Sequence, residues 1–283
     1  VLKESFRSTL PITEYSLNVL YRLVPPQQDQ DHRELVRRGL IEETVRNGRP
    51  WWRVRYNQID GPKPVFKRFL SLKHELSAVA DRVVHLIRDD AVSPGDIRLL
   101  YNGKNIPPLL VEALEPRLRA LKARLLHTTS RAFPEEADTV VVTTPHSFKG
   151  YDAEAILVVG ADQFVSFSES RILAKPLYVA LTRARSVLEL YGQNHQQDAL
   201  RETILRALEE CEDDLIGVDQ VDPRELDLAD FSEILGLIGS EHRRWLERLR
   251  RQHQLSREPM VSDSGEILGQ PVFWYRVADV SYA

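Results

Sequence analysis

The sequence predicts an α/β protein built around a buried, mostly parallel sheet. Two observations indicate this class. Short apolar runs, which are typical of strands buried on both faces, recur at Ile97–Tyr101, Thr139–Thr144 and Ala155–Gly160. Segments with helical character, such as residues 107–121 and 171–185, alternate with them. Sheets of this type bind ligands at the carboxyl ends of their strands.

The N-terminal part is predicted to hold one helix and two short strands. The segments are a helix over residues 9–24, a polar and weakly periodic stretch over residues 27–49, and strands over Trp51–Tyr56 and Pro64–Leu70. Pro25 and Pro26 end the helix. Trp51–Tyr56 interleaves aromatic and basic residues, which could stack bases, but we favour a half-buried strand with a basic outer face. Residues 27–70 are a candidate peripheral insertion.

The central part begins with a long amphipathic helix that Ser71 is expected to cap. Its apolar face comprises Leu72, Val79, Val83 and Leu86. The remaining elements are a helix over 107–121, a strand marked by Leu125 and Leu126, the strands Thr139–Thr144 and Ala155–Gly160, a helix over 171–185, and a last strand over Val187–Tyr191.

The pattern changes after Gln193. Helical character is predicted over residues 196–213 and 239–253, and Asp263–Glu266 is a turn between two strands, of which the second is Pro271–Val277. We therefore expect a small α+β appendix over residues 194–283, to which no motif gives a role.

Composition narrows the possible functions. The chain has 283 residues, 42% of them hydrophobic and 28% charged, so it can bury one large or two modest cores. The formal net charge of −4 means that any nucleic-acid surface must be a local patch. A single cysteine, Cys211, excludes an internal disulfide and favours a reducing compartment such as the cytoplasm. No run of about 18 apolar residues predicts a membrane span, and the histidines show no metal-ligand spacing.

The most informative segment runs from Val140 to Glu154. A strand leads into a polar turn that contains Thr144 and His146, and Gly150 and Asp152 follow. Hydroxyl, imidazole and carboxylate groups at a strand end suit a sugar-phosphate ligand. The same residue types also favour an ordinary crossover between strands, so this segment alone leaves both interpretations open.

Two further segments place arginines where phosphate chemistry would use them. In Lys175–Arg185, Arg183 and Arg185 follow an apolar helix, and arginine can stabilise charge on a transferring phosphoryl group. Arginines at a helix C-terminus also simply offset the helix dipole. In Leu2–Thr9, Arg7 precedes a capped helix, which alone indicates only a helix start.

Taken in order, these segments resemble the motifs of UvrD-like superfamily 1 DNA helicases. Phe6–Thr9 is similar to motif IV, Thr144–Asp152 resembles motif V (Thr-x-His-x-x-Lys-Gly-Leu-Glu), Leu177–Arg185 closely matches motif VI (Tyr-Val-Ala-Leu-Thr-Arg-Ala), and Asp96–Tyr101 resembles the strand before the single-strand contacts. The likeness covers roughly residues 1–193. It departs from the family at Pro145, and at Tyr151-Asp152, where the family has Leu-Glu.

The resemblance implies a RecA-like fold over residues 1–193, the second of two halves that close on ATP and Mg²⁺. Arg7 and Arg183 would be arginine fingers on the γ-phosphate. Gly150 would allow close backbone approach, and Asp152 stands near the nucleotide sugar.

Single-stranded DNA would be contacted by the residues that follow two strands. The resemblance assigns this role to Thr144, His146 and Asn102. RNA in place of DNA is left open, because backbone contacts discriminate poorly between them.

The sequence contains neither a Gly-x-x-x-x-Gly-Lys-Ser/Thr phosphate loop nor an acidic Walker B segment before motif IV. Both precede motif IV in the family, so we expect a fragment of a longer protein whose N-terminal RecA-like half completes the ATP site. The chain alone should have negligible ATPase activity. The alternative is a catalytically inert RecA-like domain that binds other proteins.

Overall fold

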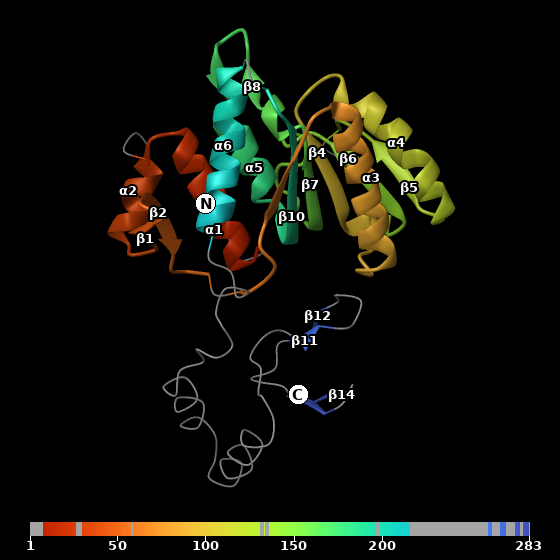
Figure 1. The fold of residues 1–283 in the computed structure, drawn as a ribbon, viewed down its shortest axis with the longest axis horizontal. Coiled ribbons are helices and arrows are strands. Elements are labelled where there is room, and N and C mark those ends of the chain that lie inside the picture. Colours follow the sequence, from red (N-terminus) through yellow and green to blue (C-terminus); the bar gives the residue numbers. More distant parts are fainter. Residues whose placement is uncertain are drawn as a thin grey trace. The chain divides into compact units, whose positions relative to one another are not determined.

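The structure is a computed structural model that describes residues 8–26, 30–57, 59–130, 133, 136–195 and 198–215, and the backbone of four short strands between residues 260 and 282 (Figure 1). The chain forms two compact units, residues 1–215 and residues 216–283.

A six-stranded sheet organises the first unit, in the order β3-β10-β7-β4-β6-β5. The strands are β3 (Val65–Phe69), β4 (Ile97–Tyr101), β5 (Arg124–His127), β6 (Thr139–Thr143), β7 (Ala153–Val159) and β10 (Ala184–Gln193). Every neighbouring pair is parallel. The predicted fold class, a RecA-like α/β sheet flanked by helices, is confirmed.

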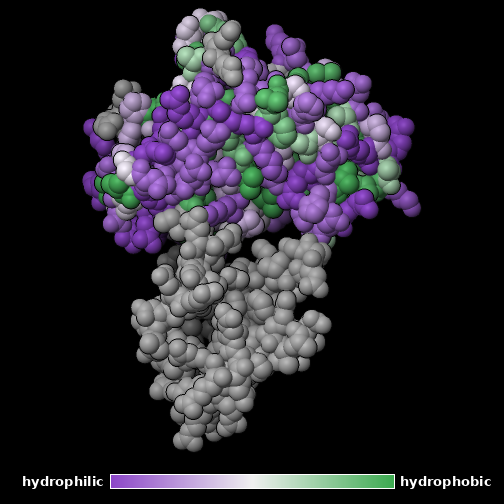
Figure 2. All heavy atoms as spheres, viewed as in Figure 1, coloured by the Kyte–Doolittle hydropathy of each residue, from purple (hydrophilic) through white to green (hydrophobic). Residues whose placement is uncertain are grey.

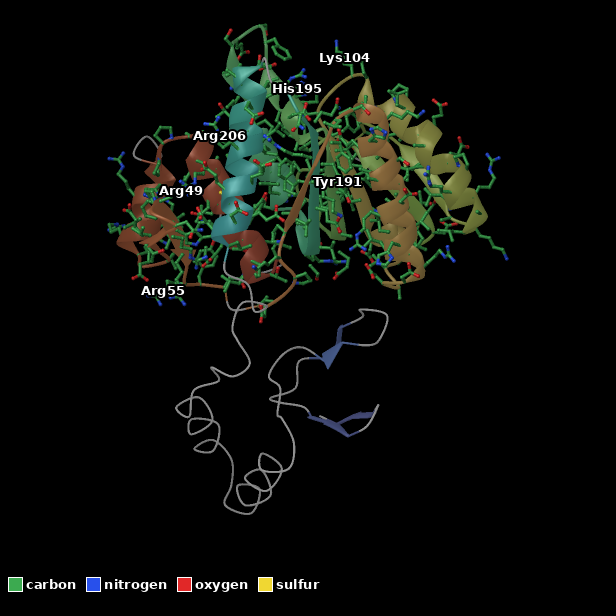
Figure 3. The ribbon with its side chains drawn as sticks, in the orientation of Figure 1. Arg49, Arg55, Lys104, Tyr191, His195 and Arg206 are labelled. Carbon is green, nitrogen blue, oxygen red and sulfur yellow. The ribbon has the colours of Figure 1, made fainter. Side chains whose placement is uncertain are left out.

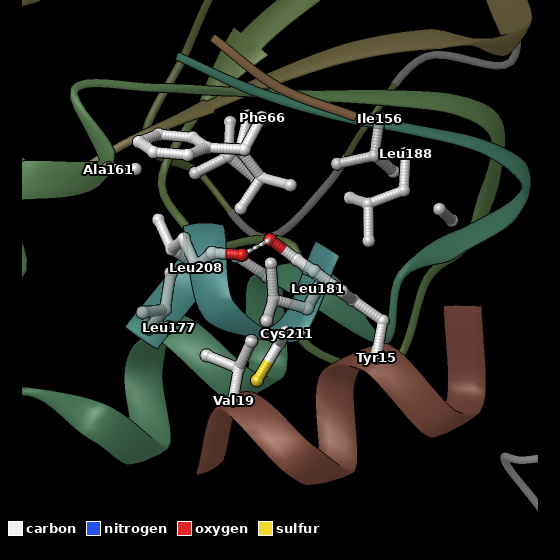
Figure 4. Close-up of a cluster of buried hydrophobic side chains, with 14 of the residues drawn as sticks. Tyr15, Val19, Phe66, Ile156, Ala161, Leu177, Leu181, Leu188, Leu208 and Cys211 are labelled. Atoms are coloured by element: carbon white, nitrogen blue, oxygen red, sulfur yellow. Dashed lines mark hydrogen bonds between the residues drawn. The ribbon is translucent and has the colours of Figure 1, made fainter. Parts of the chain in front are cut away.

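Helices cover both faces of this sheet (Figure 1). They are α1 (Leu10–Leu23), α5 (Ala174–Leu181) and α6 (Ala199–Asp214) on one face, and α3 (Leu72–Arg88) and α4 (Ile106–Ala120) on the other. Alternate residues of β7 point to opposite sides, so Ile156 packs with the first group of helices and Leu157 with the second. Figure 4 shows the first core, where the Tyr15 hydroxyl donates to the carbonyl of Leu208 at 3.1 Å.

The helix predicted after Ser71 is α3. The Ser71 hydroxyl accepts a hydrogen bond from the backbone N–H of His74, so it caps the helix as expected. Leu76, which is 4% exposed and which the sequence prediction omitted, lies between Leu72 and Val79 on the same apolar face. Two short 3₁₀ helices, Pro94–Asp96 and Ala161–Gln163, connect other elements of this unit.

The polar stretch after α1 folds into regular structure that its weak periodicity does not predict. It contains α2 (Gln30–Arg37) and a hairpin of β1 (Ile41–Arg46) and β2 (Arg49–Val54). Asn47 and Gly48 form the turn with φ values of 47° and 75°, as a tight two-residue hairpin requires. Trp51 and Trp52 are buried, which agrees with the half-buried strand and not with an open stacking platform.

The predicted helix over residues 171–185 is shorter in the structure. Residues 171–172 form β9 (Arg171–Ile172), which pairs with β8 (Val165–Ser166) in a hairpin, and α5 covers only Ala174–Leu181. Ala184 already pairs with β7, because a strand buried in the sheet satisfies its backbone and its side chains together.

The first unit continues beyond the sheet. Helix α6 buries Ile204, Leu205 and Leu208 against the core, so this unit extends to Leu215, whereas the sequence suggested a boundary at residue 193.

The second unit contains two antiparallel pairs, β11 (Met260–Val261) with β12 (Ile267–Gly269) and β13 (Tyr275–Val277) with β14 (Val280–Tyr282). The strand that follows Asp263–Glu266 and pairs across it is therefore Ile267–Gly269, and the predicted strand Pro271–Val277 contains β13, which pairs with β14 instead. The predicted helix over residues 239–253 lies outside the described residues.

Hydrophilic side chains dominate the face of the first unit drawn in Figure 2. Within the described part of the chain, no helix combines the length and the apolar character needed to cross a membrane.

Candidate functional site

The predicted site residues lie at two opposite edges of the sheet. Asn102 follows β4, and Thr144 and His146 follow β6, so these three lie at the carboxyl edge. Gly150 and Asp152 precede β7 and Arg183 precedes β10, so these three lie at the amino edge. The structure thus separates the predicted nucleic-acid contacts from the predicted nucleotide contacts.

One short crossover, residues 144–152, connects the two edges. It leaves β6 and enters β7, passing β4, which lies between them in the sheet. Thr144 begins the turn, and its hydroxyl accepts from the backbone N–H of Ser147 at 3.2 Å. The Ser147 hydroxyl donates to the carbonyl of Thr129 at 2.7 Å. Phe148 is 1% exposed and packs with the first core, so the crossover is anchored at its centre.

Aromatic contacts hold the second half of the crossover. The rings of Phe148 and Tyr151 stack with their centroids 5.7 Å apart, and Phe133 meets both edge-on. The guanidinium of Arg98, on β4, lies 5.9 Å from the Phe148 ring centroid. These contacts limit how far either end of the crossover can move alone.

At the amino edge, the backbone at Gly150 is accessible and hydrogen bonds fix the side chain of Arg183. Gly150 has a φ of 98°, and no atom lies within 4 Å of where its Cβ would be, so a ligand could approach the backbone there. Arg183 is 6% exposed. Its Nη1 donates to the carbonyl of Tyr151 at 3.3 Å, and its Nε donates to the carbonyl of Val179 at 3.1 Å. The segments that contain Gly150 and Arg183 are therefore in direct contact.

Asp152 belongs to a charged cluster that the sequence does not predict. Arg185 lies 3.6 Å from Asp152, 2.8 Å from Asp96 and 3.3 Å from Glu154. Asp152 and Glu154 lie at the start of β7, and Asp96 lies in the 3₁₀ turn before β4, whereas Arg185 is in β10. No local pattern signals this cluster, because it depends on which strands are neighbours.

Arg7 lies outside the described residues. The residues that follow it contact the start of β10, where the Ser8 hydroxyl donates to the carbonyl of Ala184 at 2.6 Å and the backbone N–H of Thr9 donates to the carbonyl of Arg185 at 3.0 Å. The segment that resembles motif IV thus begins beside the end of the segment that resembles motif VI.

The carboxyl edge holds an open cleft of about 1050 Å³. Asn102 and Thr144 both line this cleft. The sequence resemblance predicts both of them to contact the same nucleic-acid strand. The Asn102 amide donates to the backbone carbonyl of Gln163 at 2.6 Å, which ties the end of β4 to the 3₁₀ helix after β7. His146 is exposed but is not among the lining residues.

Several further side chains of this cleft are aromatic or basic. Phe167, in the turn between β8 and β9, is 59% exposed, and Lys104 and Arg171 are exposed cations. Arg171 is paired with Glu169. Figure 3 shows Lys104 and His195 at the same end of the sheet. No sequence pattern singles out Phe167, and the helix predicted over residues 171–185 hides the hairpin position of Arg171.

A tyrosine and a histidine form part of the cleft wall. The Tyr101 hydroxyl and His127 Nε2 are 2.8 Å apart. Burial raises the pKa of Tyr101 above its usual value, so the phenol remains a neutral hydrogen-bonding group. The cleft therefore offers hydrogen-bonding, cationic and aromatic surfaces together, a combination that suits a single nucleic-acid strand.

Two features of the amino edge could bind an anion, beside the three carboxylates that Arg185 holds there. Arg183 brings a permanent positive charge, and the backbone at Gly150 is accessible. Among the residues that the structure describes, no group of three or more His, Cys, Asp or Glu side chains is arranged to hold a metal ion.

No family model and no curated protein sequence matches this chain. Solved structures that resemble this chain include two helicase chains. The C-terminal domain of a possible DNA helicase from Lactobacillus plantarum WCFS1 has a TM-score of 0.44 and 16% identity, covering 72% of this chain and 96% of that one. An arterivirus nonstructural protein 10 (helicase) in complex with DNA has a TM-score of 0.28 and 12% identity, covering 59% of this chain and 44% of that one. Likenesses at this level concern the fold alone.

Proposed function

We propose that this chain is the C-terminal motor half of an ATP-dependent, UvrD-like superfamily 1 DNA helicase or translocase. The observation that carries the proposal is the hydrogen bond from Arg183 to the carbonyl of Tyr151, at 3.3 Å. It joins, at one edge of the sheet, the two segments that resemble motifs V and VI. Further support comes from the opposite edge, where Asn102 and Thr144 share a cleft with aromatic and basic side chains.

In this proposal the amino edge forms one wall of the ATP site. The N-terminal RecA-like half of the same protein would supply the phosphate-binding loop and the Mg²⁺ ligands. Arg7 and Arg183 would stabilise charge on the γ-phosphate during hydrolysis. Gly150 would let the backbone approach the nucleotide, and Asp152, held by Arg185, would face its sugar.

The carboxyl edge would hold single-stranded DNA. Lys104 and Arg171 would attract the phosphates, and Phe167 would stack on a base. Thr144 and His146 would contact the strand at the start of the crossover. Because the crossover reaches Asp152 at its other end, closure on ATP and reopening after hydrolysis would move the DNA-facing residues by a step.

The first test is ATP hydrolysis with and without single-stranded DNA, by this chain alone and by the longer parent protein. We expect DNA-stimulated turnover from the parent only, because the chain lacks the phosphate-binding loop. If neither protein hydrolyses ATP, the proposal is wrong and an inert protein-interaction domain replaces it.

The second test is Arg183→Ala in the parent protein. We expect kcat to fall by roughly 10³-fold or more, as for other arginine fingers, with little change in ATP binding. Arg206→Ala, an equal change of charge at an exposed position of α6, is the control. Normal turnover by a folded Arg183→Ala protein would contradict the motif VI assignment. Arg183→Lys keeps the positive charge but not the guanidinium that donates to Tyr151 and Val179. Comparing its kcat with that of Arg183→Ala shows how much of the loss comes from the charge and how much from these hydrogen bonds.

A further inference from the structure

We propose that Arg201 is a positioning residue for the carboxyl-edge cleft, which holds Phe167 and Gln163 in the arrangement that binds single-stranded DNA. The inference rests on the proposed function of this cleft. It gives a role to α6, in the part of the chain after Gln193 that carries no recognisable motif.

Arg201 contacts two residues that line the cleft. Its Nη2 donates to the side-chain oxygen of Gln163 at 3.2 Å, and its guanidinium lies 5.1 Å from the centroid of the Phe167 ring. Both partners line the cleft, whereas Arg201 does not, and its side chain is only 18% exposed. Arg201 therefore acts on a bound strand through its neighbours.

The two partners of Arg201 are central to the cleft. Phe167 is a largely exposed aromatic ring in the short turn between β8 and β9. The backbone carbonyl of Gln163 accepts from Asn102, one of the predicted DNA contacts. A shift of Arg201 would thus disturb both the stacking surface and the loop that orients Asn102.

Arg201 is itself held by a buried acidic network. Asp162 is fully buried, and its Oδ2 lies 2.8 Å from His195 Nε2 and 3.9 Å from Arg201 Nη1. Arg201 Nη1 lies 3.1 Å from His195 Nε2, and Arg201 Nε lies 3.3 Å from Asp198 at the N-terminus of α6. The backbone N–H of Gln193 also donates to Asp162, at 3.0 Å, so the network is joined to the end of β10.

Only arginine can make these contacts at once. Its planar guanidinium donates in several directions and can stack on an aromatic ring, whereas a lysine ammonium is a compact point charge. Replacement by lysine would keep the net charge but not the simultaneous contacts to Gln163, Phe167 and Asp198. This separates a positioning role from a simple contribution to positive charge.

The test is binding of fluorescein-labelled oligo(dT) to the full 283-residue chain, followed by fluorescence anisotropy. We expect Phe167→Ala to weaken binding roughly tenfold, the order expected for loss of one stacked base. Arg201→Ala and Arg201→Lys should each weaken it roughly three- to tenfold, and the matched control Arg206→Ala, on the same helix, less than about twofold. In the Phe167→Ala background, Arg201→Ala should cost less than it does alone, because the two act together.

The outcomes separate the two proposals. If Phe167→Ala weakens binding but both Arg201 variants match Arg206→Ala, the role of Arg201 is wrong and the cleft stands. If the unmodified chain does not bind oligo(dT), or Phe167→Ala binds as well as the unmodified chain, the cleft itself is overturned and the role of Arg201 with it. Tighter binding of oligo(rU) would overturn DNA as the ligand. Thermal unfolding checks that each variant is folded. If Arg201→Ala does not fold, the oligo(dT) affinity of Arg201→Lys, which keeps the charge, decides the role of Arg201.

Discussion

Glu75 shows how strongly the fold changes the chemistry of one residue. It lies in the first turn of α3, fully buried, where it accepts from the backbone N–H of Gly160 at 2.7 Å and from the side chain of Gln193 at 3.2 Å. Burial raises the pKa of Glu75 to about 7, and the charge of Asp162 acts in the same direction. The carboxyl group is thus half ionised near neutral pH.

This environment predicts a specific pH dependence of stability. The pKa of Glu75 rises from 4.5 in the unfolded chain to about 7 on folding, so the folded state binds the proton more tightly. Its contribution to the free energy of unfolding is therefore largest below about pH 4.5 and is lost as the pH rises through 7. Glu75→Gln keeps an acceptor for Gly160 but cannot ionise. Relative to the unmodified chain, the variant should gain up to roughly 3 kcal/mol between pH 4.5 and pH 8.

Urea unfolding at both pH values checks this prediction. Glu112→Gln, at an exposed position of α4, is the control and should show the pH dependence of the unmodified chain. An identical pH dependence for all three proteins would mean that Glu75 ionises normally in the folded state.

The hairpin of β1 and β2 depends on a helix to complete its hydrogen bonding. Asn18 of α1 accepts from the backbone N–H of Trp52 at 2.8 Å and donates to the carbonyl of Trp52 at 2.9 Å. Glu14, one turn earlier, accepts from the backbone N–H of Val54 at 2.9 Å. Side chains of α1 thus take the place of a neighbouring strand along the edge of β2.

Removal of the Asn18 amide tests this helix-to-strand link. Asn18→Ala would leave a buried donor and a buried acceptor of Trp52 without partners, which should lower the free energy of unfolding by roughly 2–4 kcal/mol. Asn18→Asp should cost less, because the carboxylate still accepts from Trp52. Asn105→Ala, at an exposed position, is the control for urea denaturation. A loss below about 0.5 kcal/mol, the level of a surface substitution, would show that the link is not stabilising.

At the scale of the whole molecule, α6 connects the sheet to the site. It buries Ile204, Leu205 and Leu208 in the first core, and it carries Arg201 to the back of the cleft. Residues 1–215 form one compact unit. They should therefore be the cooperative folding unit that contains both edges of the site.

Two truncations test this boundary. A chain that ends at Leu215 should keep the cooperative thermal transition and the oligo(dT) affinity of the full chain. A chain that ends at Gln193 loses three fully buried side chains of α6, each worth roughly 2–5 kcal/mol, so it should not unfold cooperatively. Circular dichroism melting distinguishes the two. A cooperative transition in the shorter chain would place the boundary at residue 193.

The sequence by itself determined the fold class and most strands and helices of the central sheet. Apolar runs predict β4 and β6 to within a residue, and helical spacing predicts α1, because these patterns follow from the geometry of a strand or a helix alone. The order of the motif-like segments also indicated which residues to consider, including Thr144 and Arg183. These inferences need no knowledge of which elements are neighbours.

The tertiary structure alone decided how these residues are grouped. The crossover that contains Thr144 and Asp152 reverses across the sheet, so a single motif serves two opposite edges. The carboxylates around Arg185 and the contact between Arg201 and Phe167 join segments that are distant in sequence. The physical reason is that strand order sets which side chains meet across a sheet, and local periodicity carries no information about strand order.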